Sequence, residues 1–125
     1  MAQSFDLLCR KPAGFAVLTG EDGWFYSMLA QGAEGGITAS AHLRTGDFAR
    51  VRQRLLAGDQ PGALALWRDL AALPRLLFAE PSPAPIKHWL WRQGLIDSPE
   101  LRLPMAGVTP ALAGQLDRAF AACRA

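Results

Sequence analysis

The two lysines, Lys11 and Lys87, are the side chains in this sequence that could form a Schiff base with the carbonyl group of a substrate. A Schiff-base lysine must be neutral when it attacks, which requires a desolvated site or a nearby positive charge. Lys87 follows the proline-rich stretch "FAEPSPAP" and falls in the first turn of a helix expected over about residues 85–93, where the helix dipole disfavours a further cation. Lys87 is therefore a candidate nucleophile, and an ordinary residue in a helix turn is the alternative.

Three polar residues could be read as a hydrolase triad, namely Ser40, His42 and Asp47. No GxSxG elbow precedes the serine, and all three residues crowd one loop, so a loop entering a helix is the better interpretation. The "GAEGG" loop could bind phosphate only if a helix followed it. A strand is expected there, so the loop is predicted to be a turn.

Arginines, tryptophans and cysteines complete the set of candidate side chains. Arg50 and Arg54 share a helical face and could bind an anion, although a solvated helix face explains them as well. The tryptophans could stack on a ligand, but at helical spacing they more often belong to a core or an interface: Trp67, Trp89 and Trp91. The two cysteines, Cys9 and Cys123, have no CxxC spacing and no histidine cluster, so reduced thiols are expected and neither a zinc site nor a disulfide framework is indicated.

The composition indicates one ordinary folded domain. Half of the 125 residues are apolar, 19% are charged, and the net charge of +2 is too small to favour nucleic acid. No apolar run reaches the roughly 18 residues of a membrane span, and "MAQSFDLLCRKP" does not resemble a signal peptide. We therefore expect a cytoplasmic protein with no membrane or nucleic-acid partner, no metal and no cofactor.

The first third of the chain is expected to alternate helices and strands. A short helix near Ser4 precedes the strand "FAVLTG", a helix from about Asp22 to Gln31 stops at Gly32, and "GITASA" forms a second strand. This order predicts a parallel pair joined by a crossover, with the first strand buried on both faces. Two parallel strands make a poor sheet, so the chain reads as the end of a larger α/β layer.

From Gly46 onward the pattern indicates helices only. A helix is expected up to Gly58 and another after Pro61, kinked at Pro74. A final helix follows Thr109, its predicted N-cap. Residues 1–45 are thus assigned to strand–helix units, and residues 46–125 to a last layer helix and a helical C-terminal region.

Several motifs in combination carry a resemblance to a known family. The stretch "FAVLTGEDGWFYSMLAQGAEGGITASAHL", followed by "LFAEPSPAPIKHWLWRQGLIDSPELRLPMAGVT", resembles the C-terminal part of the dihydrodipicolinate synthase and N-acetylneuraminate lyase family. The resemblance implies the last two strands of a (β/α)8 barrel, a fold that needs ~250 residues, followed by extra helices. It also implies a Schiff-base mechanism on pyruvate with an aldehyde as second substrate, and a homo-oligomer.

The resemblance assigns roles to four residues. Gly20 matches the glycine that leaves room beside the Schiff base, and Ile37 matches a residue lining the pyruvate pocket; Glu21 and Asp22 fall where relatives place polar residues near the second substrate. The family's Schiff-base lysine lies on an earlier strand outside these residues. Lys87 then belongs to the helical appendage, and Lys11 lies at the end of the barrel opposite the chemistry.

Two functional hypotheses follow from the resemblance. In the first, these residues supply part of the pocket wall and the scaffold of a pyruvate-dependent aldolase or lyase, and they have no turnover alone. In the second, they form a non-enzymatic product that self-associates through an exposed strand edge and unburied apolar faces. Ser82, Trp89 and Trp91 depart from the family pattern, which affects the expected interface geometry.

Overall fold

The computed structural model describes residues 2–124, with side chains up to residue 122, in two compact units, Met1–Ala72 and Leu73–Ala125. Cys9 is exposed and unpaired, whereas the prediction for Cys123 lies outside the described side chains. The division predicted at residue 45 separates parts of a barrel rather than compact units, and it stays a prediction.

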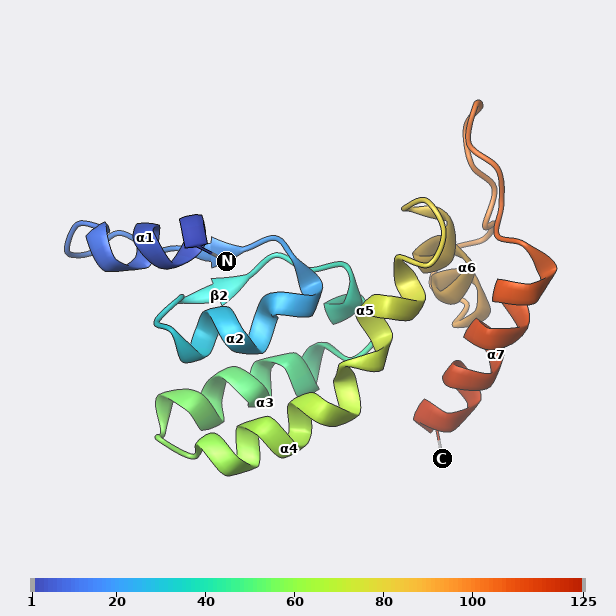
Figure 1. Cartoon of the computed structure of the whole chain (residues 1–125). Helices are drawn as coiled ribbons and strands as arrows, with labels where there is room; N and C mark the ends of the chain where they lie inside the picture. The colour runs from blue at the N-terminus through green and yellow to red at the C-terminus, as the bar shows by residue number, and fades with distance from the viewer. Residues whose placement is uncertain (1, 125) are drawn as a thin grey trace. The chain divides into compact units, whose positions relative to one another are not determined.

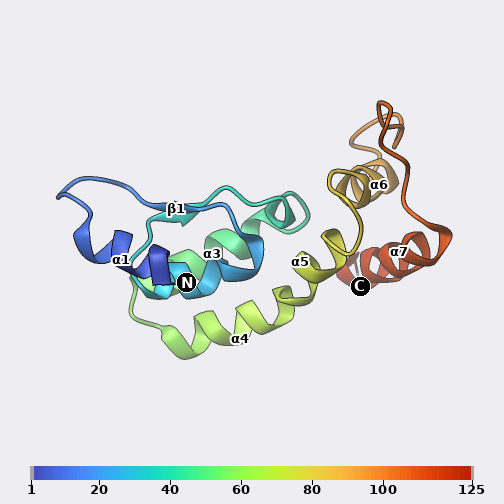
Figure 2. The ribbon, with the colours of Figure 1, turned by 45° about the horizontal axis from the view of Figure 1, so that its top comes forward.

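The first unit combines a pair of short strands with helices on one side of it (Figure 1). Figure 1 shows the strands over α2, with α3 and α4 packed side by side below, and in Figure 2 α4 lies on the side of the unit away from β1. The elements are α1 (Ala2–Arg10), β1 (Leu18–Thr19), the 3-10 helix η1 (Asp22–Trp24), α2 (Phe25–Ala30), β2 (Gly35–Gly36), the 3-10 helix η2 (Ser40–His42), α3 (Thr45–Leu56) and α4 (Gln60–Leu70).

The two strands pair in parallel, as predicted, with Leu18 opposite Gly35 and Thr19 opposite Gly36. The Ile37 amide donates to the Thr19 carbonyl at 2.8 Å, which extends the pairing by one residue. Both strands are shorter than expected. Of the predicted strand "GITASA" only Gly36 lies in β2, and its second half was wrong because residues Ser40–His42 form η2, held in place by a buried carboxylate described below.

Only one face of β1 is covered within the described residues. Val17 and Thr19 are buried, while Leu18 between them is 49% exposed and Ile37 after β2 is 77% exposed. The prediction that this strand is buried on both faces was therefore wrong for this structure. The helices of the first unit cover one face of a strand pair, and the alternating side chains of the other face are left in the open.

Aromatic side chains hold the helices of the first unit together. Phe25 of α2 meets Phe48 of α3 edge-on at 5.0 Å between ring centroids and lies 6.1 Å from Trp67 of α4. All three are buried. Trp67 is thus a core residue, and its predicted alternative role as a stacking platform is not available in this structure.

Helix α2 ends where the sequence predicts. Gly32 has φ = 100°, and the amides of Gly32 and Ala33 donate to the carbonyls of Leu29 and Met28. This is the Schellman pattern, in which the left-handed residue is most easily a glycine. Ala33 and Met28 belong to the same buried cluster, so the turn also directs the chain into β2.

The second unit is helical within the described residues. Its elements are α5 (Ala72–Leu77, beginning at the division between the units), α6 (Ala84–Arg92) and α7 (Pro110–Arg124). The helix expected to bend at Pro74 is instead two helices, since α4 ends at Leu70 and α5 begins two residues later. The rings of Trp89 and Phe120 meet edge-on at 5.7 Å and join α6 to α7.

Thr109 caps α7 as predicted, and a glutamate of the "FAEP" motif supports it. The Thr109 hydroxyl accepts from the Leu112 amide at 3.3 Å, and both the Thr109 amide and its hydroxyl donate to the Glu80 carboxylate. A carboxylate next to a helix N-terminus also interacts favourably with the helix dipole. The motif glutamate thereby fixes where the last helix begins.

Glu34 and Lys11 form an ion pair at the end of the strands opposite Gly20. Glu34 also accepts from the Val17 amide at 2.7 Å. The hydrogen bond from Lys11, followed by that from Val17, holds the pKa of Glu34 below its ordinary value of 4.5. Since the folded-state pKa is the lower one, this contribution to stability is present above the unfolded-state pKa and is lost as the pH falls through the folded-state pKa.

We therefore expect acid to destabilise the wild-type chain more steeply than a Glu34→Gln variant. Melting temperatures measured from pH 7 down to pH 3 should fall less below about pH 4.5 in the variant. Lys11→Met removes the main cause of the shift and should flatten the profile in the same direction. Parallel profiles for the three proteins would contradict the assignment.

Candidate functional site

The four residues that the resemblance singles out lie together at the carboxyl ends of the strands. Gly20 and Glu21 follow β1 directly, Asp22 begins η1, and Ile37 follows β2. In barrels of parallel strands this is the edge that carries binding and catalytic residues. Gly20, Glu21 and Ile37 are exposed, and Asp22 is buried at 2% exposure. Whether these residues bind substrate stays a prediction.

Gly20 faces open space in the described structure. A Cβ atom built on it would meet no heavy atom within 4 Å, and its φ lies outside the left-handed region. Neither packing nor backbone conformation in these residues therefore requires glycine at this position. The remaining explanation for a glycine at position 20 is that its missing side chain leaves room for another molecule or for another part of a barrel.

Asp22 links the turn after β1 to the turn after β2. Its carboxylate accepts from the backbone amides of Ala39 at 3.1 Å and Ser40 at 2.5 Å, and the Ser40 hydroxyl donates to the same oxygen as the Ser40 amide. Ser40 has no exposed surface. The carboxylate thus fixes the two turns that carry Gly20 and Ile37, a role that the sequence analysis did not identify.

Glu21 shapes the turn between β1 and η1. Its carboxylate accepts from the Gly23 amide at 3.2 Å, and its own amide donates to the Thr19 hydroxyl at 3.2 Å. The side chain is otherwise exposed at the strand edge. Glu21 is therefore the acidic group of this edge that a ligand could reach, whereas Asp22 is committed to the protein.

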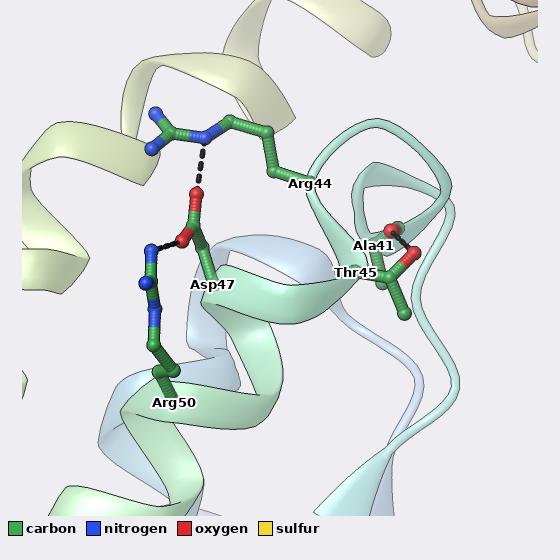
Figure 3. A network of polar contacts seen from close by, with 5 residues as sticks. All are labelled: Ala41, Arg44, Thr45, Asp47 and Arg50. Atoms are coloured by element: carbon green, nitrogen blue, oxygen red, sulfur yellow. Dashed lines mark hydrogen bonds and ion pairs between the residues drawn. The ribbon is translucent and has the colours of Figure 1, made fainter.

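Ser40, His42 and Asp47, the residues considered as a possible hydrolase triad, do not come together. The Ser40 hydroxyl is bonded to Asp22, and His42 is exposed. Asp47 lies between the guanidinium groups of Arg44 and Arg50 and accepts from both (Figure 3). The arrangement is that of a helix-entry loop, as predicted, and among the described contacts the serine hydroxyl is bonded to a carboxylate rather than to the histidine that a triad requires.

Arginines on α3 are engaged by groups of the protein itself. Arg50 pairs with Asp47, Arg54 pairs with Asp59 at 2.5 Å, and the Nε of Arg52 donates to the Glu34 carbonyl at 2.7 Å. The amide of Gly62 and the guanidinium of Arg54 hold the pKa of Asp59 below its usual value. The alternative of an anion site on this face gains no support from these contacts.

The two lysines, one in each unit, are both bonded to other groups of the protein. The Nζ of Lys11 is paired with Glu34 at the opposite ends of the strands, and the Nζ of Lys87 donates to the Glu100 carbonyl within the second unit. Both amines are therefore engaged by oxygen atoms of the protein itself, and these contacts give no support to either lysine as a Schiff-base nucleophile. Of the two candidate tryptophans in α6, Trp89 is buried, and Trp91 is 39% exposed with its ring beside that of His88.

Within the described part of the chain, no three His, Cys, Asp or Glu side chains are placed to hold a metal ion. Among the helices that the structure describes, none combines the length and the apolar character needed to cross a bilayer. The candidate ligand-binding site of the first unit is thus its strand edge, which has an open position at Gly20 and an exposed carboxylate at Glu21.

Comparisons with known proteins agree with this geometry. The dihydrodipicolinate synthetase family matches residues 1–122. The chain is 43% identical over 116 residues to 4-hydroxy-tetrahydrodipicolinate synthase 2 of Clostridium acetobutylicum, a match that covers 93% of this chain and 41% of that protein. It is 34% identical over 118 residues to the corresponding synthase of Chlorobium luteolum, covering 94% and 40%.

Solved structures give the same result for the fold. Dihydrodipicolinate synthase from Aquifex aeolicus matches with a TM-score of 0.92 at 26% identity, covering 98% of this chain and 42% of that one. The synthase from Acinetobacter baumannii, solved in complex with pyruvate, matches with a TM-score of 0.87 at 28% identity, covering 96% and 41%. The chain spans about two fifths of the length of these relatives, and its strands and helices are the C-terminal part of their TIM barrel with its helical appendage. It therefore belongs to the dihydrodipicolinate synthetase family.

Proposed function

We propose that these residues form one wall of the pyruvate pocket in a Schiff-base aldolase or lyase of the dihydrodipicolinate synthase type. The observation that carries the proposal is the open position at Gly20, where nothing in the described structure requires a glycine. Ile37, 77% exposed on the adjoining strand, supplies apolar surface to the same wall. The pyruvate complex of the Acinetobacter baumannii relative supports the choice of ligand.

The nucleophile comes from the part of the barrel outside these residues. Its lysine nitrogen adds to the ketone carbon of pyruvate and water leaves, and loss of a proton from the methyl carbon gives an enamine that attacks the aldehyde. Gly20 leaves space for the bound pyruvate, and Ile37 excludes water from it. Glu21 faces the second substrate, and Asp22 holds the two turns in register.

Trapping with pyruvate and borohydride tests this function. The chain alone should give no adduct in its intact mass. Mixed with the separately expressed N-terminal portion of the Clostridium acetobutylicum relative, which supplies the remainder of a barrel, it should support an adduct on a lysine of that portion. An adduct at Lys11 or Lys87 would instead make one of them the nucleophile and refute the proposal.

A matched pair of glycine variants locates the pocket. Gly20→Val places a branched side chain in the proposed space and should abolish the adduct in the mixture. Gly46→Val is the control, because Gly46 also has nothing within 4 Å of a built Cβ but lies in the first turn of α3 rather than in a turn directly after a strand. Equal trapping with the two variants would remove Gly20 from the pocket.

The exposed apolar side chains of the strand face favour one alternative, a non-enzymatic product that pairs with a second copy. Leu18, 49% exposed, and Ile37 lie on this uncovered face. Sedimentation of the chain alone distinguishes the two functions. A stable dimer that Leu18→Asp dissociates, with no binding to the N-terminal portion, would replace the enzymatic proposal with this one.

A further inference from the structure

Two buried polar atoms at the C-terminal end of α6 have no partner among the described residues. They are the indole Nε1 of Trp89 and the side-chain Oε1 of Gln93. Trp89 is 1% exposed and is the largest of the fully buried side chains described. A buried donor or acceptor without a partner costs stability, so nearly all such atoms in native proteins are hydrogen-bonded to protein or to ordered water.

The cationic side chains and the histidine of α6, by contrast, are engaged. The Lys87 amine donates to the Glu100 carbonyl, and the Nε of Arg92 donates to the Asp117 carboxylate at 2.9 Å. The Nε2 of His88 lies 3.1 Å from the same carboxylate oxygen. The two unpaired atoms are therefore exceptions on this helix.

The spacing of the two residues brings them to one face of α6. Trp89 and Gln93 are four residues apart, and Gln93 is the C-cap residue of the helix. Side chains at this spacing lie on adjacent turns, with their Cβ atoms about 5–6 Å apart. One of the two atoms can only donate a hydrogen bond and the other can only accept one. A single small group that both accepts and donates would satisfy the pair.

The burial of Trp89 limits what this group can be. With 1% of the residue exposed, a side chain of another protein cannot reach its Nε1. A water molecule is small enough, and its oxygen accepts while its protons are donated. Buried waters typically make two to four hydrogen bonds to polar groups that would otherwise be unpaired.

We propose that α6 binds one buried water between the Nε1 of Trp89 and the Oε1 of Gln93. The indole donates to the water oxygen, and the water donates one proton to the amide oxygen. The site lies where α6 packs beside α7 through the rings of Trp89 and Phe120 (Figures 1 and 2). It belongs to the second unit and does not depend on the proposed pyruvate pocket, whose residues belong to the first.

Water-selective nuclear magnetic resonance on the ¹⁵N-labelled chain tests the inference. The Hε1 proton of Trp89, identified by its loss in Trp89→Phe, should show a nuclear Overhauser effect to water. It should also exchange at least about tenfold more slowly than the indole protons of Trp24 and Trp91, which are each 39% exposed. Slow exchange separates a bound water from direct exchange with the solvent. Gln93→Leu removes the acceptor and should abolish the effect.

Gln31→Leu is the matched control, because Gln31 is the C-cap residue of α2 and its Nε2 donates to the Ser27 carbonyl on an exposed surface. This variant should leave the effect at Trp89 unchanged. Absence of the effect in the wild-type chain, or its persistence in Gln93→Leu, would overturn the inference. A shift of the Hε1 resonance in Phe120→Leu, with no effect to water, would show that the indole donates to the phenylalanine ring instead.

Thermal unfolding gives a second readout of the shared water. Each single change, Trp89→Phe or Gln93→Leu, leaves one buried polar atom with a water that has lost its other partner. The double variant leaves neither atom, and replacing both partners by apolar groups is often nearly neutral. Its melting temperature should therefore lie above the value expected if the two single losses added. Additive losses would show that the two atoms have no partner in common.

Discussion

Replacing Asp22 with alanine is expected to lower the free energy of unfolding of the first unit by about 2–3 kcal/mol. The carboxylate accepts from two backbone amides and from the Ser40 hydroxyl, and both Asp22 and Ser40 are buried. Without it, the amides of Ala39 and Ser40 lose their acceptor, and water cannot easily replace it. Unpaired buried donors are the costly part of such a change.

Urea denaturation followed by far-ultraviolet circular dichroism measures this effect. Asp22→Asn retains one acceptor oxygen and should lose less stability than the alanine variant. Glu21→Ala is the neighbouring control, since Glu21 is exposed and loses only its bond to the Gly23 amide, so its change should stay at about 1 kcal/mol or less. If Asp22→Ala and Glu21→Ala unfold at the same urea concentration, the link between the two turns does not stabilise the unit.

The Asp22 contacts illustrate what sequence reasoning could not find. Asp22 and Ser40 lie 18 residues apart, in two turns that become neighbours only once β1 and β2 pair. The sequence shows no local relation between the two residues. Asp22 was therefore predicted to contact the substrate, and Ser40 was considered as a possible nucleophile. The only available signal was the prediction that both turns follow parallel strands and thus meet at one edge.

The ends of helices, by contrast, were predicted correctly from local sequence patterns. Gly32 and Gly94 have φ of 100° and 73° and end α2 and α6, as a glycine after an apolar helical pattern predicts. Thr109 caps α7 in the same way. These predictions succeed because each depends on backbone chemistry within a few residues, which tertiary packing does not override.

The burial of the strands could not be predicted from the same kind of signal. The run "FAVLTG" has the apolar content of a strand covered on both faces, and Leu18 would be covered in a complete barrel. In the described residues it is 49% exposed, because the helices cover one face only. The apolar composition of the strand thus fits the burial expected in a complete barrel and not the partial burial that the described residues provide.

Replacing Gly36 with alanine is expected to destabilise the first unit by about 1–3 kcal/mol through overpacking. A Cβ atom built on Gly36 would lie 2.8 Å from the Cδ2 of Phe25 and 2.9 Å from the Cγ2 of Thr19. Phe25 cannot move away easily, because its ring is enclosed by Phe48 and Trp67. The close approach of α2 to β2 therefore depends on the missing side chain at this position.

Thermal unfolding of a matched set of glycine variants decides whether this contact matters. For a unit of this size, each kcal/mol should lower the melting temperature by about 4–8 °C. Gly35→Ala should cost less, because its nearest neighbour is the flexible end of Leu18 at 3.3 Å, and Gly20→Ala should cost least, because nothing lies within 4 Å. Equal melting temperatures for Gly36→Ala and Gly20→Ala would show that α2 shifts away without cost. The expected order instead separates a glycine required by packing from one whose open space we assign to pyruvate.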